Sequence, residues 1–163
     1  MIDVRTPLAT AGPLSSTDLA ERTGASRATV RRALDTLGPE LLQAGRARAT
    51  RYALRRDVPG VVGPVPLYDL GAPGPLHVAD LHPVEPAQGL YLQARVSDIA
   101  SRWLDNWPWF LESLRPGGYL GRRLHQRHPD RGLGPNPRLW SQAELLRFLA
   151  DREHGIAEAV QLV

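Results

Sequence analysis

Cysteine and lysine are both absent from these 163 residues, and methionine occurs only once. Without cysteine there is neither a disulfide framework nor a thiolate metal site, so a reducing compartment, by default the cytoplasm, is the expectation. No run approaches the roughly 18 apolar residues that a membrane span requires, and residues 1–12 lack the apolar stretch of a secretory signal. We therefore expect neither a membrane protein nor a secreted one.

All 20 basic side chains are arginines, and they are unevenly balanced by acidic residues. Residues 1–60 contain ten arginines and six acidic residues (+4), whereas residues 61–163 contain ten arginines and eleven acidic residues (−1), which together give the net charge of +3. The use of arginine alone is explained equally well by coding bias and by bidentate phosphate binding. The excess of positive charge in the first third predicts an anionic partner there.

A change in composition near residue 60 indicates two domains. The stretch RRDVPGVVGPVPLYDLGAPGPL (55–76) contains prolines and glycines that exclude a continuous helix. A hydrophobic content of 42% is sufficient for packed cores. We expect one domain over residues 1–58 and a second over residues 59–163, both of the α+β class.

Helix signals follow one another in the first domain. Residues 2–11 have the length of a short helix. Ser15 followed by Asp18 resembles a capping box that starts a second helix, and Gly24 ends it. The next helix is expected immediately afterwards, with Ser26 as its amino-terminal cap.

The helix after Ser26 is predicted to be amphipathic. Its apolar residues have the i, i+3, i+4, i+7 spacing of one buried face, formed by Val30, Ala33, Leu34 and Leu37. At about 100° per residue, Arg31 and Arg32 lie opposite that face, and Arg27 lies in the exposed first turn. The arginines are therefore expected to face outward while the helix is anchored in the core.

A basic hairpin is predicted downstream. The segment ELLQAGRARATRYALRR (40–56) favours two short strands, Leu41–Ala44 and Thr50–Leu54, joined by a loop that contains Gly45, Arg46 and Arg48. A hairpin of this length directly after two helices has the form of a wing.

The spacing Ala20-x3-Gly24-x5-Val30 is typical of a helix-turn-helix. A small residue lets the helices approach, glycine takes the turn, and a branched apolar residue locks the second helix into the core. Together with the hairpin, residues 1–57 resemble winged helix-turn-helix DNA-binding domains. The plainer alternative is an αα-hairpin with a solvated arginine face, but the spacing, the outward arginines and the basic hairpin together count against it.

The resemblance implies a helix in the major groove of double-stranded DNA and a wing on the backbone or minor groove. Guanidinium groups then bind guanine or phosphate, and hydroxyl groups bind phosphate. The predicted DNA contacts are Ser26, Arg27, Ala28, Thr29, Arg31, Arg32, Arg46, Arg48 and Arg51. The pattern leaves open which arginine reads a base.

In the second domain the pattern predicts short strands and then helices. The strands are expected in VPLYDL (65–70), LHVADLHPVE (76–85) and GLYLQARV (89–96). One helix is expected to begin near Tyr119. Another is expected after a Ser141 cap, with three inward leucines and a glycine stop; these residues are Leu145, Leu146, Leu149 and Gly155.

A family resemblance covers this second domain. WFLESLRPGGYLGRRL (109–124), followed by ELLRFLADREHG (144–155) and AEAVQLV (157–163), resembles the amino-terminal subdomain of HipA-family serine/threonine kinase toxins. The whole chain is similar to the start of the YjjJ-type branch, whose members carry their own amino-terminal winged helix. Arg115 and Gly117 stand where the family often has other residues.

Kinase chemistry is not expected from this chain. The family's ATP-binding loop and its catalytic aspartates lie beyond the amino-terminal subdomain, and no His-Arg-Asp or Asp-Phe-Gly run occurs here. RPGGYLGRR (115–123) lacks Gly-x-Gly-x-x-Gly spacing and a preceding strand, so a turn is predicted. We expect no catalytic residue and no cofactor.

Two polar pairs are interpreted as surface features. His125 and His128 have the spacing of a metal-binding pair, but no cysteine accompanies them and Pro129 follows directly. Asp151 and Glu153 point to different faces of a helix and do not form a catalytic carboxylate pair. No metal site is expected.

Tryptophan is expected mainly in the core of the second domain, where all four residues lie: Trp103, Trp107, Trp109 and Trp140. Trp107 and Trp109 flank a proline, which favours partial exposure. With Arg115 they form the predicted interface for a protein partner.

Three functional hypotheses follow. The first is a non-catalytic regulator of a HipA-type toxin–antitoxin system that binds operator DNA through its winged helix and a kinase toxin through its second domain. The sequence leaves its oligomeric state open, with a homodimer as one option. The second is the amino-terminal fragment of a longer HipA-family kinase, which the strand-like end EAVQLV (158–163) favours. The third is a winged-helix regulator with a ligand-sensing domain among the tryptophans.

Overall fold

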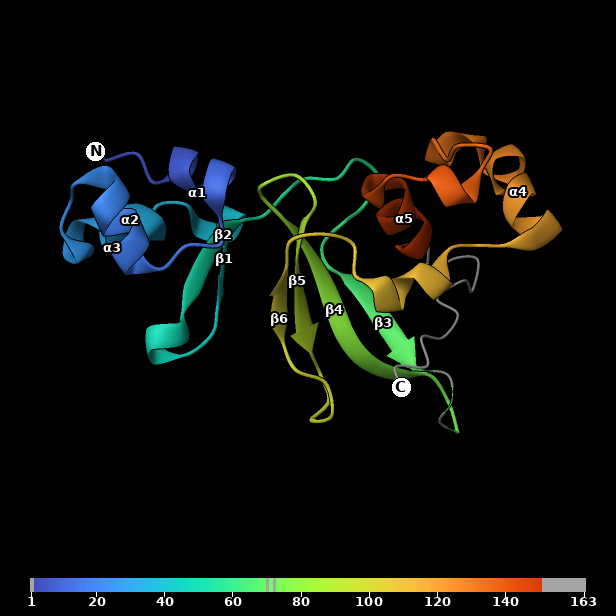
Figure 1. The fold of residues 1–163 in the computed structure, drawn as a ribbon, viewed down its shortest axis with the longest axis horizontal. Helices are drawn as coiled ribbons and strands as arrows, with labels where there is room; N and C mark the ends of the chain where they lie inside the picture. Colours follow the sequence, from blue (N-terminus) through green and yellow to red (C-terminus); the bar gives the residue numbers. More distant parts are fainter. Residues whose placement is uncertain (1, 70, 72, 151–163) are drawn as a thin grey trace. The chain divides into compact units, whose positions relative to one another are not determined.

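Residues 2–69, 71 and 73–150 are described by a computed structural model, in which the chain divides into two compact units (Figure 1). The first unit consists of Met1–Arg56 and Pro83–Gly89, and the second of Asp57–His82 and Leu90–Val163. Both units combine helices with antiparallel strands, which confirms the α+β class. The division of the chain into separately folding domains at residues 58 and 59 stays a prediction.

The first unit contains three short helices and a hairpin. Their bounds are α1 Arg5–Ala11, α2 Ser16–Thr23, α3 Arg27–Asp35, β1 Leu41–Ala44 and β2 Arg51–Leu54. An isolated antiparallel bridge from Leu14 to Tyr52 adds a third, minimal strand to the hairpin. Short 3-10 turns at Gly38–Glu40 and Ala47–Ala49 complete the unit.

The helix boundaries follow from the capping residues that the sequence predicts. The Ser15 hydroxyl accepts the Asp18 N–H at 3.1 Å, and the Asp18 carboxylate accepts the Ser15 N–H at 2.8 Å, so the capping box is confirmed. Gly24 ends α2 in the left-handed region, at φ 67°, where glycine carries no steric cost. The Ser26 hydroxyl accepts the Thr29 N–H at 3.2 Å and caps α3.

One helix is shorter than the sequence suggests. A helix was expected over residues 2–11, but α1 begins at Arg5. The Asp3 carboxylate accepts the N–H groups of Arg5 and Thr6 at 2.9 and 3.1 Å, which satisfies donors of the first turn and fixes the start of the helix there. Pro7 then lies within the first turn, where its missing N–H costs nothing.

The core of the first unit is small and mostly helical. Its buried members are Val4, Leu8, Leu14, Leu19, Val30, Ala33, Leu34 and Leu54. The predicted inward face of α3 is therefore correct for its three helical members, while Leu37, which follows the end of the helix, packs only partly buried at the edge. Burial of this face fixes which side of α3 is left to solvent.

The hairpin is the predicted wing. Leu41 pairs with Leu54 and Ala44 with Arg51, and the second strand starts one residue later than Thr50 because residues 47–49 form a 3-10 turn. Gly45 lies at φ 93°, and a Cβ there would collide with the Ala49 carbonyl oxygen. The tight entry to the wing loop therefore requires glycine.

The first unit also includes a turn from far along the chain, which the sequence did not predict. The Glu85 N–H donates to the Leu54 carbonyl at 2.9 Å, and the Arg56 N–H donates to the Pro83 carbonyl at 3.0 Å. Pro83–Gly89 thus pairs with the chain that leaves β2 and extends its hydrogen bonding.

A four-stranded antiparallel sheet is the centre of the second unit, with strand order β3-β4-β5-β6 (Figure 1). The bounds are β3 Val65–Asp69, β4 Leu76–Val84, β5 Gly89–Ala94 and β6 Arg102–Leu104. The first three strands lie where they were predicted, whereas β6 was not expected. A register shift between Leu67 and Tyr68 interrupts the pairing of β3 with β4.

Short helices follow the sheet. Their bounds are Trp109–Leu114 for a 3-10 helix, α4 Gly118–Arg127, and α5 Gln142–Leu149, with 3-10 turns at Pro129–Arg131 and Pro137–Leu139. Ser141 and Glu144 form the capping box of α5, and the three predicted leucines of this helix are buried. The predicted stop at Gly155, the pair Asp151 and Glu153, and the strand-like 157–163 lie outside the described residues.

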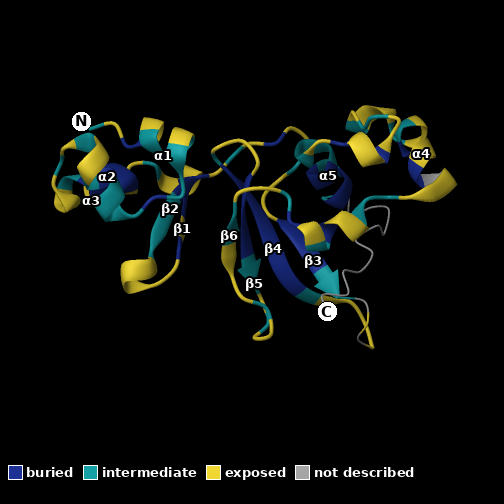
Figure 2. Cartoon of the chain, in the orientation of Figure 1, coloured by how far each residue is buried: buried dark blue, intermediate teal, exposed yellow. Residues whose placement is uncertain are grey.

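The core of the second unit lies between one face of the sheet and the helices, and its buried residues come from the strands, the helices and the segments between them (Figure 2). It includes Val65, Leu67, Leu81, Leu90, Leu92, Leu111, Trp140, Leu145 and Leu146. None of the helices in the described ranges is both long enough and apolar enough to cross a bilayer.

The opposite face of the sheet carries a buried carboxylate. Asp80 is only 3% exposed, and its two oxygens contact Arg95 Nε at 2.5 Å and His77 Nε2 at 2.9 Å. A buried carboxylate is tolerated only with such partners. Arg95 is therefore used to stabilise the unit itself.

Candidate nucleic-acid interface

The exposed face of α3 carries the predicted arginines. Arg27, Arg31 and Arg32 are all exposed, and none of them forms an ion pair with any of the described residues. Ala28 is exposed beside them in the first turn. Because the apolar face of α3 is buried, these side chains on the opposite face are directed to solvent, as the periodicity predicts.

The hydroxyl groups at the start of α3 are coupled to each other. The oxygens of Ser26 and Thr29 lie 2.9 Å apart, so one hydroxyl donates to the other. Ser26 also accepts the Thr29 N–H, which is its capping role. One hydroxyl proton of the pair is consumed in this bond, which leaves the other for an acceptor outside the protein.

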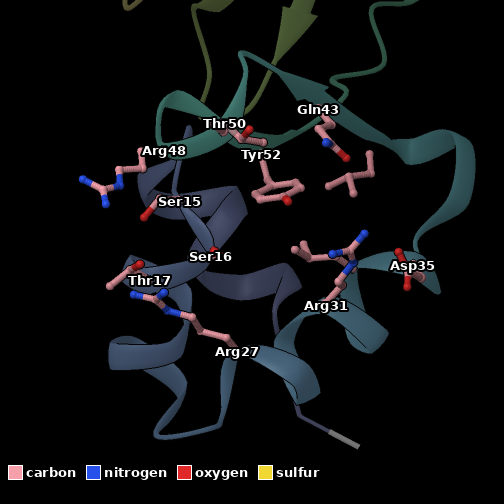
Figure 3. Close-up of a pocket in the computed structure, with 13 residues that line it drawn as sticks. Ser15, Ser16, Thr17, Arg27, Arg31, Asp35, Gln43, Arg48, Thr50 and Tyr52 are labelled. Atoms are coloured by element: carbon pink, nitrogen blue, oxygen red, sulfur yellow. The ribbon is translucent and has the colours of Figure 1, made fainter.

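A polar groove of about 870 Å³ lies beside α3. Its walls come from the start of α2, from α3 and from the wing, and Figure 3 shows the side chains that surround it. The lining residues are Ser15, Ser16, Thr17, Arg27, Arg31, Leu34, Asp35, Leu41, Gln43, Ala47, Arg48, Thr50 and Tyr52. Three arginines against one aspartate give this lining a charge of +2.

Some of the predicted DNA contacts meet in this groove and others do not. Arg27, Arg31 and Arg48 line it together, although they come from two different elements. The remaining predicted residues, Ser26, Ala28, Thr29, Arg32, Arg46 and Arg51, are not part of the lining. Arg32 lies next to Arg31 on the same exposed helix face.

Sequence reasoning missed several residues of the groove. Ser16 and Thr17 lie at the start of α2, and Gln43 and Tyr52 come from the two strands of the wing. The only sequence signal for them was the capping box of Ser15, because hydroxyl-rich residues at a helix start lie beside N–H groups that the helix leaves open. The wing residues gave no signal before the hairpin register was known.

Arg51 differs from the other predicted wing arginines. Arg46 and Arg48 are exposed in the loop, whereas Arg51 lies on β2 and its Nη1 is 3.8 Å from the Asp18 carboxylate. Hydrogen bonds from Ser15 lower the pKa of Asp18, and the charge of Arg51 lowers it further. Arg51 therefore has an anionic neighbour within the fold.

The three residues of the predicted partner interface differ in exposure and in their contacts. Trp109 is 82% exposed, whereas Trp107 is half-buried against the core. Arg115 Nε donates to Glu112 at 2.6 Å, and its Nη1 donates to the carbonyl oxygens of Pro137 and Trp140 at 3.2 and 2.9 Å. Arg115 thus ties the Glu112 turn to the start of α5.

Trp107 and Trp109 differ in their surroundings. Among the described residues the buried indole N–H of Trp107 has no hydrogen-bond acceptor. Trp109 borders an open cavity of about 540 Å³ that is lined by apolar residues and by Asp69, Asp98 and Arg102. The role of both tryptophans and of Arg115 in partner binding stays a prediction.

The remaining candidates of the sequence lie apart from these sites. Trp140 is 3% exposed, as expected for a core residue, and its indole N–H donates to the Gly134 carbonyl at 2.7 Å. Trp103 is half-buried and stacks on Tyr91, with ring centroids 4.5 Å apart. In the described ranges no three histidine or acidic side chains gather as metal ligands, so His125 and His128 do not belong to such a group.

Comparison with known proteins assigns both halves of the chain. Residues 8–38 match the IclR helix-turn-helix domain, and residues 62–160 match the middle domain of YjjJ-like toxins. The chain belongs to the YjjJ-like toxin family. The match over residues 8–38 covers α2, α3 and the turn between them, which confirms the helix-turn-helix resemblance.

A curated relative extends the match across both units. The chain is 35% identical over 146 residues to Toxin YjjJ of Escherichia coli strain K12, which covers 88% of this chain. The chain spans 32% of the length of that relative. No solved structure matches the chain significantly.

Proposed function

We propose that this protein is a non-catalytic, cytoplasmic DNA-binding regulator of a HipA-type toxin–antitoxin system. The groove beside α3 carries the proposal, because it brings three arginines from α3 and the wing to one polar surface at the helix-turn-helix. Double-stranded DNA presents phosphates and base edges to such a surface. The exposed face of α3 enters the major groove, and the wing meets the backbone.

Phosphate binding is assigned to the start of α2 and to the wing. Ser15 caps the Asp18 N–H, and Ser16 and Thr17, in the first turn of α2 where N–H groups lack intrahelical acceptors, line the groove. The positive end of the helix dipole and the Arg48 guanidinium favour an anion at this place. A phosphate there fixes the register of α3 on the duplex.

Base reading is assigned to Arg31 and Arg32, which lie in the middle of α3, with Arg27 at its amino-terminal end. A bidentate contact of arginine to guanine O6 and N7 contributes about 1–3 kcal/mol of discrimination. The hydroxyl proton that the Ser26–Thr29 pair leaves over is suited to a phosphate oxygen. The methyl group of Ala28 is suited to the methyl group of thymine.

The second unit is proposed to bind a kinase toxin through Trp109, with Trp107 and Arg115 beside it. The 82% exposure of Trp109 supports this role, because tryptophan is enriched among the residues that dominate protein interfaces. Such binding makes the chain an antitoxin that regulates its own operator.

A second candidate function is favoured by the comparisons. Residues 62–160 match a domain named as the middle domain of its family, and the chain spans 32% of its curated relative. In this candidate the two units are the DNA-binding front of a longer toxin with a HipA-type kinase. The reading frame after Val163 distinguishes the candidates: a stop codon followed by a kinase gene supports the regulator, and an open frame into a kinase domain supports the longer toxin.

The DNA proposal is tested by mobility-shift titration against the promoter of the chain's own gene. Arg31→Ala with Arg32→Ala is expected to weaken binding by about 5- to 150-fold for each base contact that is lost. Arg48→Ala removes a phosphate contact, so it is expected to weaken operator and random DNA alike and to reduce the salt slope by about 0.9.

Arg22→Ala is the matched control, since it removes one exposed arginine from α2 outside the groove. Operator affinity of the Arg31→Ala, Arg32→Ala protein equal to that of the Arg22→Ala protein contradicts the proposed recognition surface. Circular dichroism of each variant shows that the helices are retained.

A further inference from the structure

Helix α4 of the second unit presents a basic face without an acidic partner among the described residues. Leu124 is buried, and Gly121 packs so closely on Pro116 that a Cβ would collide with its backbone. These two residues are three apart and fix the inner face of the helix. The outer face is exposed, as the colouring of α4 in Figure 2 shows, and it consists of Tyr119, Arg122, Arg123, Gln126 and Arg127.

Positive charge is concentrated around this helix. Residues 115–138 contain six arginines and a single acidic residue, Asp130, which gives +5 over 24 residues. Asp130 lies 3.7 Å from Arg131, on the 3-10 turn that follows α4. The exposed face of the helix itself is therefore left without an acidic neighbour on its own segment.

Several other arginines of the second unit have partners elsewhere in the fold. Arg95 binds the buried Asp80, Arg102 lies over the Phe110 ring at 4.9 Å, and Arg115 binds Glu112 and two carbonyl groups. By contrast, Arg122 and Arg127 have no partner among the described residues, and Arg123 lies only over the Tyr119 ring, at 4.6 Å.

This arrangement does not stabilise the helix. Arg123 and Arg127 are four residues apart, so their charges repel across one turn. The helix dipole favours a cation in the last turn and accounts for Arg127, but Arg122 and Arg123 lie in the middle of the helix, where that effect has faded. An anion bound from outside relieves the repulsion along the whole face.

We propose that the exposed face of α4 binds the phosphate backbone of double-stranded DNA as a second, sequence-independent contact. Protein–DNA interfaces are more polar and much more positively charged than protein–protein interfaces, whose centres are depleted of charge. A face with three guanidinium groups, one amide and one tyrosine matches the former. Adjacent turns place the guanidinium groups along the helix, so that they meet successive phosphates.

The proposal rests on the proposed function in one respect: DNA is chosen as the polyanion because the first unit carries a helix-turn-helix. The two surfaces are nevertheless distinct sets of residues, and each is removed separately by substitution. Loss of one surface therefore reports on that surface alone.

The test measures binding of the full chain to a random-sequence duplex over a series of salt concentrations. Arg122→Ala, Arg123→Ala, Arg127→Ala in one protein is expected to lower the slope of log K against log salt by about 2–3, since each lost phosphate contact contributes about 0.9. The same three positions changed to lysine keep their charge, so this control is expected to retain most of the slope. An unchanged slope in the alanine protein, with helix content intact by circular dichroism, overturns the proposal.

Two further measurements distinguish failure of the α3 proposal from failure of the α4 proposal. One protein carries Arg31→Ala and Arg32→Ala, and a second carries these two changes together with Arg122→Ala, Arg123→Ala and Arg127→Ala. The second protein is expected to lose the random-sequence binding that the first one retains. If the Arg31→Ala, Arg32→Ala protein binds operator DNA like wild type while the α4 alanine protein is impaired on random-sequence duplex, the recognition surface proposed for α3 fails and the α4 surface stands. If polyglutamate competes for the chain better than duplex DNA at equal charge, α4 binds an acidic protein and the proposal is overturned.

Discussion

The arginines of α3 and the wing loop differ in their surroundings from several arginines of the second unit. In the first unit the arginines of α3 and the wing loop point to solvent and have no acidic partner among the described residues. In the second unit Arg95, Arg115 and Arg147 hold the fold together, through Asp80, Glu112 and backbone carbonyl groups. The first unit has ion-paired arginines as well, since Arg5 binds Glu40 and Arg51 lies near Asp18. The number of arginines alone therefore does not locate a candidate anion-binding surface, because several of them are already bound within the fold.

The arginines of helix α4 are an exception in this comparison. It lies in the second unit, yet its arginines resemble those of α3 in being exposed and without acidic partners. A like-charged helix face is tolerated because the inner face, with Leu124, is buried in the core of the unit. The division therefore follows the surroundings of each arginine and not the unit to which it belongs.

The largest effect on stability is expected from a large-to-small substitution in the hydrophobic core of one unit. Leu19 is fully buried in the first unit, and Leu19→Ala is expected to destabilise that unit by about 2–5 kcal/mol. All four tryptophans lie in the second unit, so their fluorescence reports on it alone, whereas circular dichroism reports on helices of both. In urea, the variant is expected to lose part of its helix signal early while the fluorescence midpoint stays in place.

Leu145→Ala is the matched control for this experiment, because Leu145 is equally buried in the second unit. It is expected to lower the fluorescence midpoint. A fluorescence midpoint that shifts as much with Leu19→Ala as with Leu145→Ala means that the units unfold together, and the contrast between two separate regions then loses its basis.

An intermediate effect is expected from comparing an internal arginine with an outward one. Arg115→Ala leaves Glu112 and the carbonyl groups of Pro137 and Trp140 without their donor, and it is expected to cost about 1–3 kcal/mol of stability. Arg32→Ala removes an exposed side chain with no acidic partner in the described chain, and it is expected to change stability by less than about 0.5 kcal/mol. Urea denaturation measures both. Equal losses would show that Arg32 has an internal role.

The smallest effect concerns the acids that start two helices. Hydrogen bonds from Ser15 hold the pKa of Asp18 below its ordinary 3.8. Burial raises the pKa of Glu144, but hydrogen bonds from Ser141 and Gly134 outweigh it, so that the pKa lies below its ordinary 4.5. Because both are lowered on folding, their stabilisation is complete above the ordinary values and is lost as the pH falls through the lower, folded values.

Acid titrations followed by circular dichroism check this expectation. Asp18→Asn and Glu144→Gln are each expected to make helix content less dependent on pH below about 4.5, since an amide does not titrate in this range. Titration curves of both variants that overlay the wild-type curve would mean that the capping boxes do not contribute to acid sensitivity.

Local elements were predictable from the sequence. The capping box of α2, the Ser141 cap of α5 and the buried face of α3 depend on residues three or four apart, and the structure has them where they were expected; the Glu144 partner in the α5 capping box was not predicted. The helix-turn-helix follows from the same local signals. The candidate site was predicted in part, because Arg27, Arg31 and Arg48 line one groove, whereas the wing residues Gln43 and Tyr52 needed the hairpin register.

Elements that depend on distant partners were not predictable. Strand β6 has only three residues and forms because β5 offers an edge for it. Pro83–Gly89 pairs with the end of β2 from about 30 residues away, which no periodicity indicates. The early start expected for the first helix was wrong because Asp3 satisfies the first N–H groups instead of joining the helix.

The sequence by itself determined where the helices of the helix-turn-helix begin and end and which face of α3 is apolar, because caps and periodicity act within one or two turns. Only the tertiary structure decided which arginines are neutralised. Arg95 donates to Asp80, which is 15 residues away in the sequence, and Arg115 donates to the Trp140 carbonyl, which is 25 residues away. Such pairs form only after the chain has closed long loops, so the sequence alone does not show which arginines remain exposed without an acidic partner.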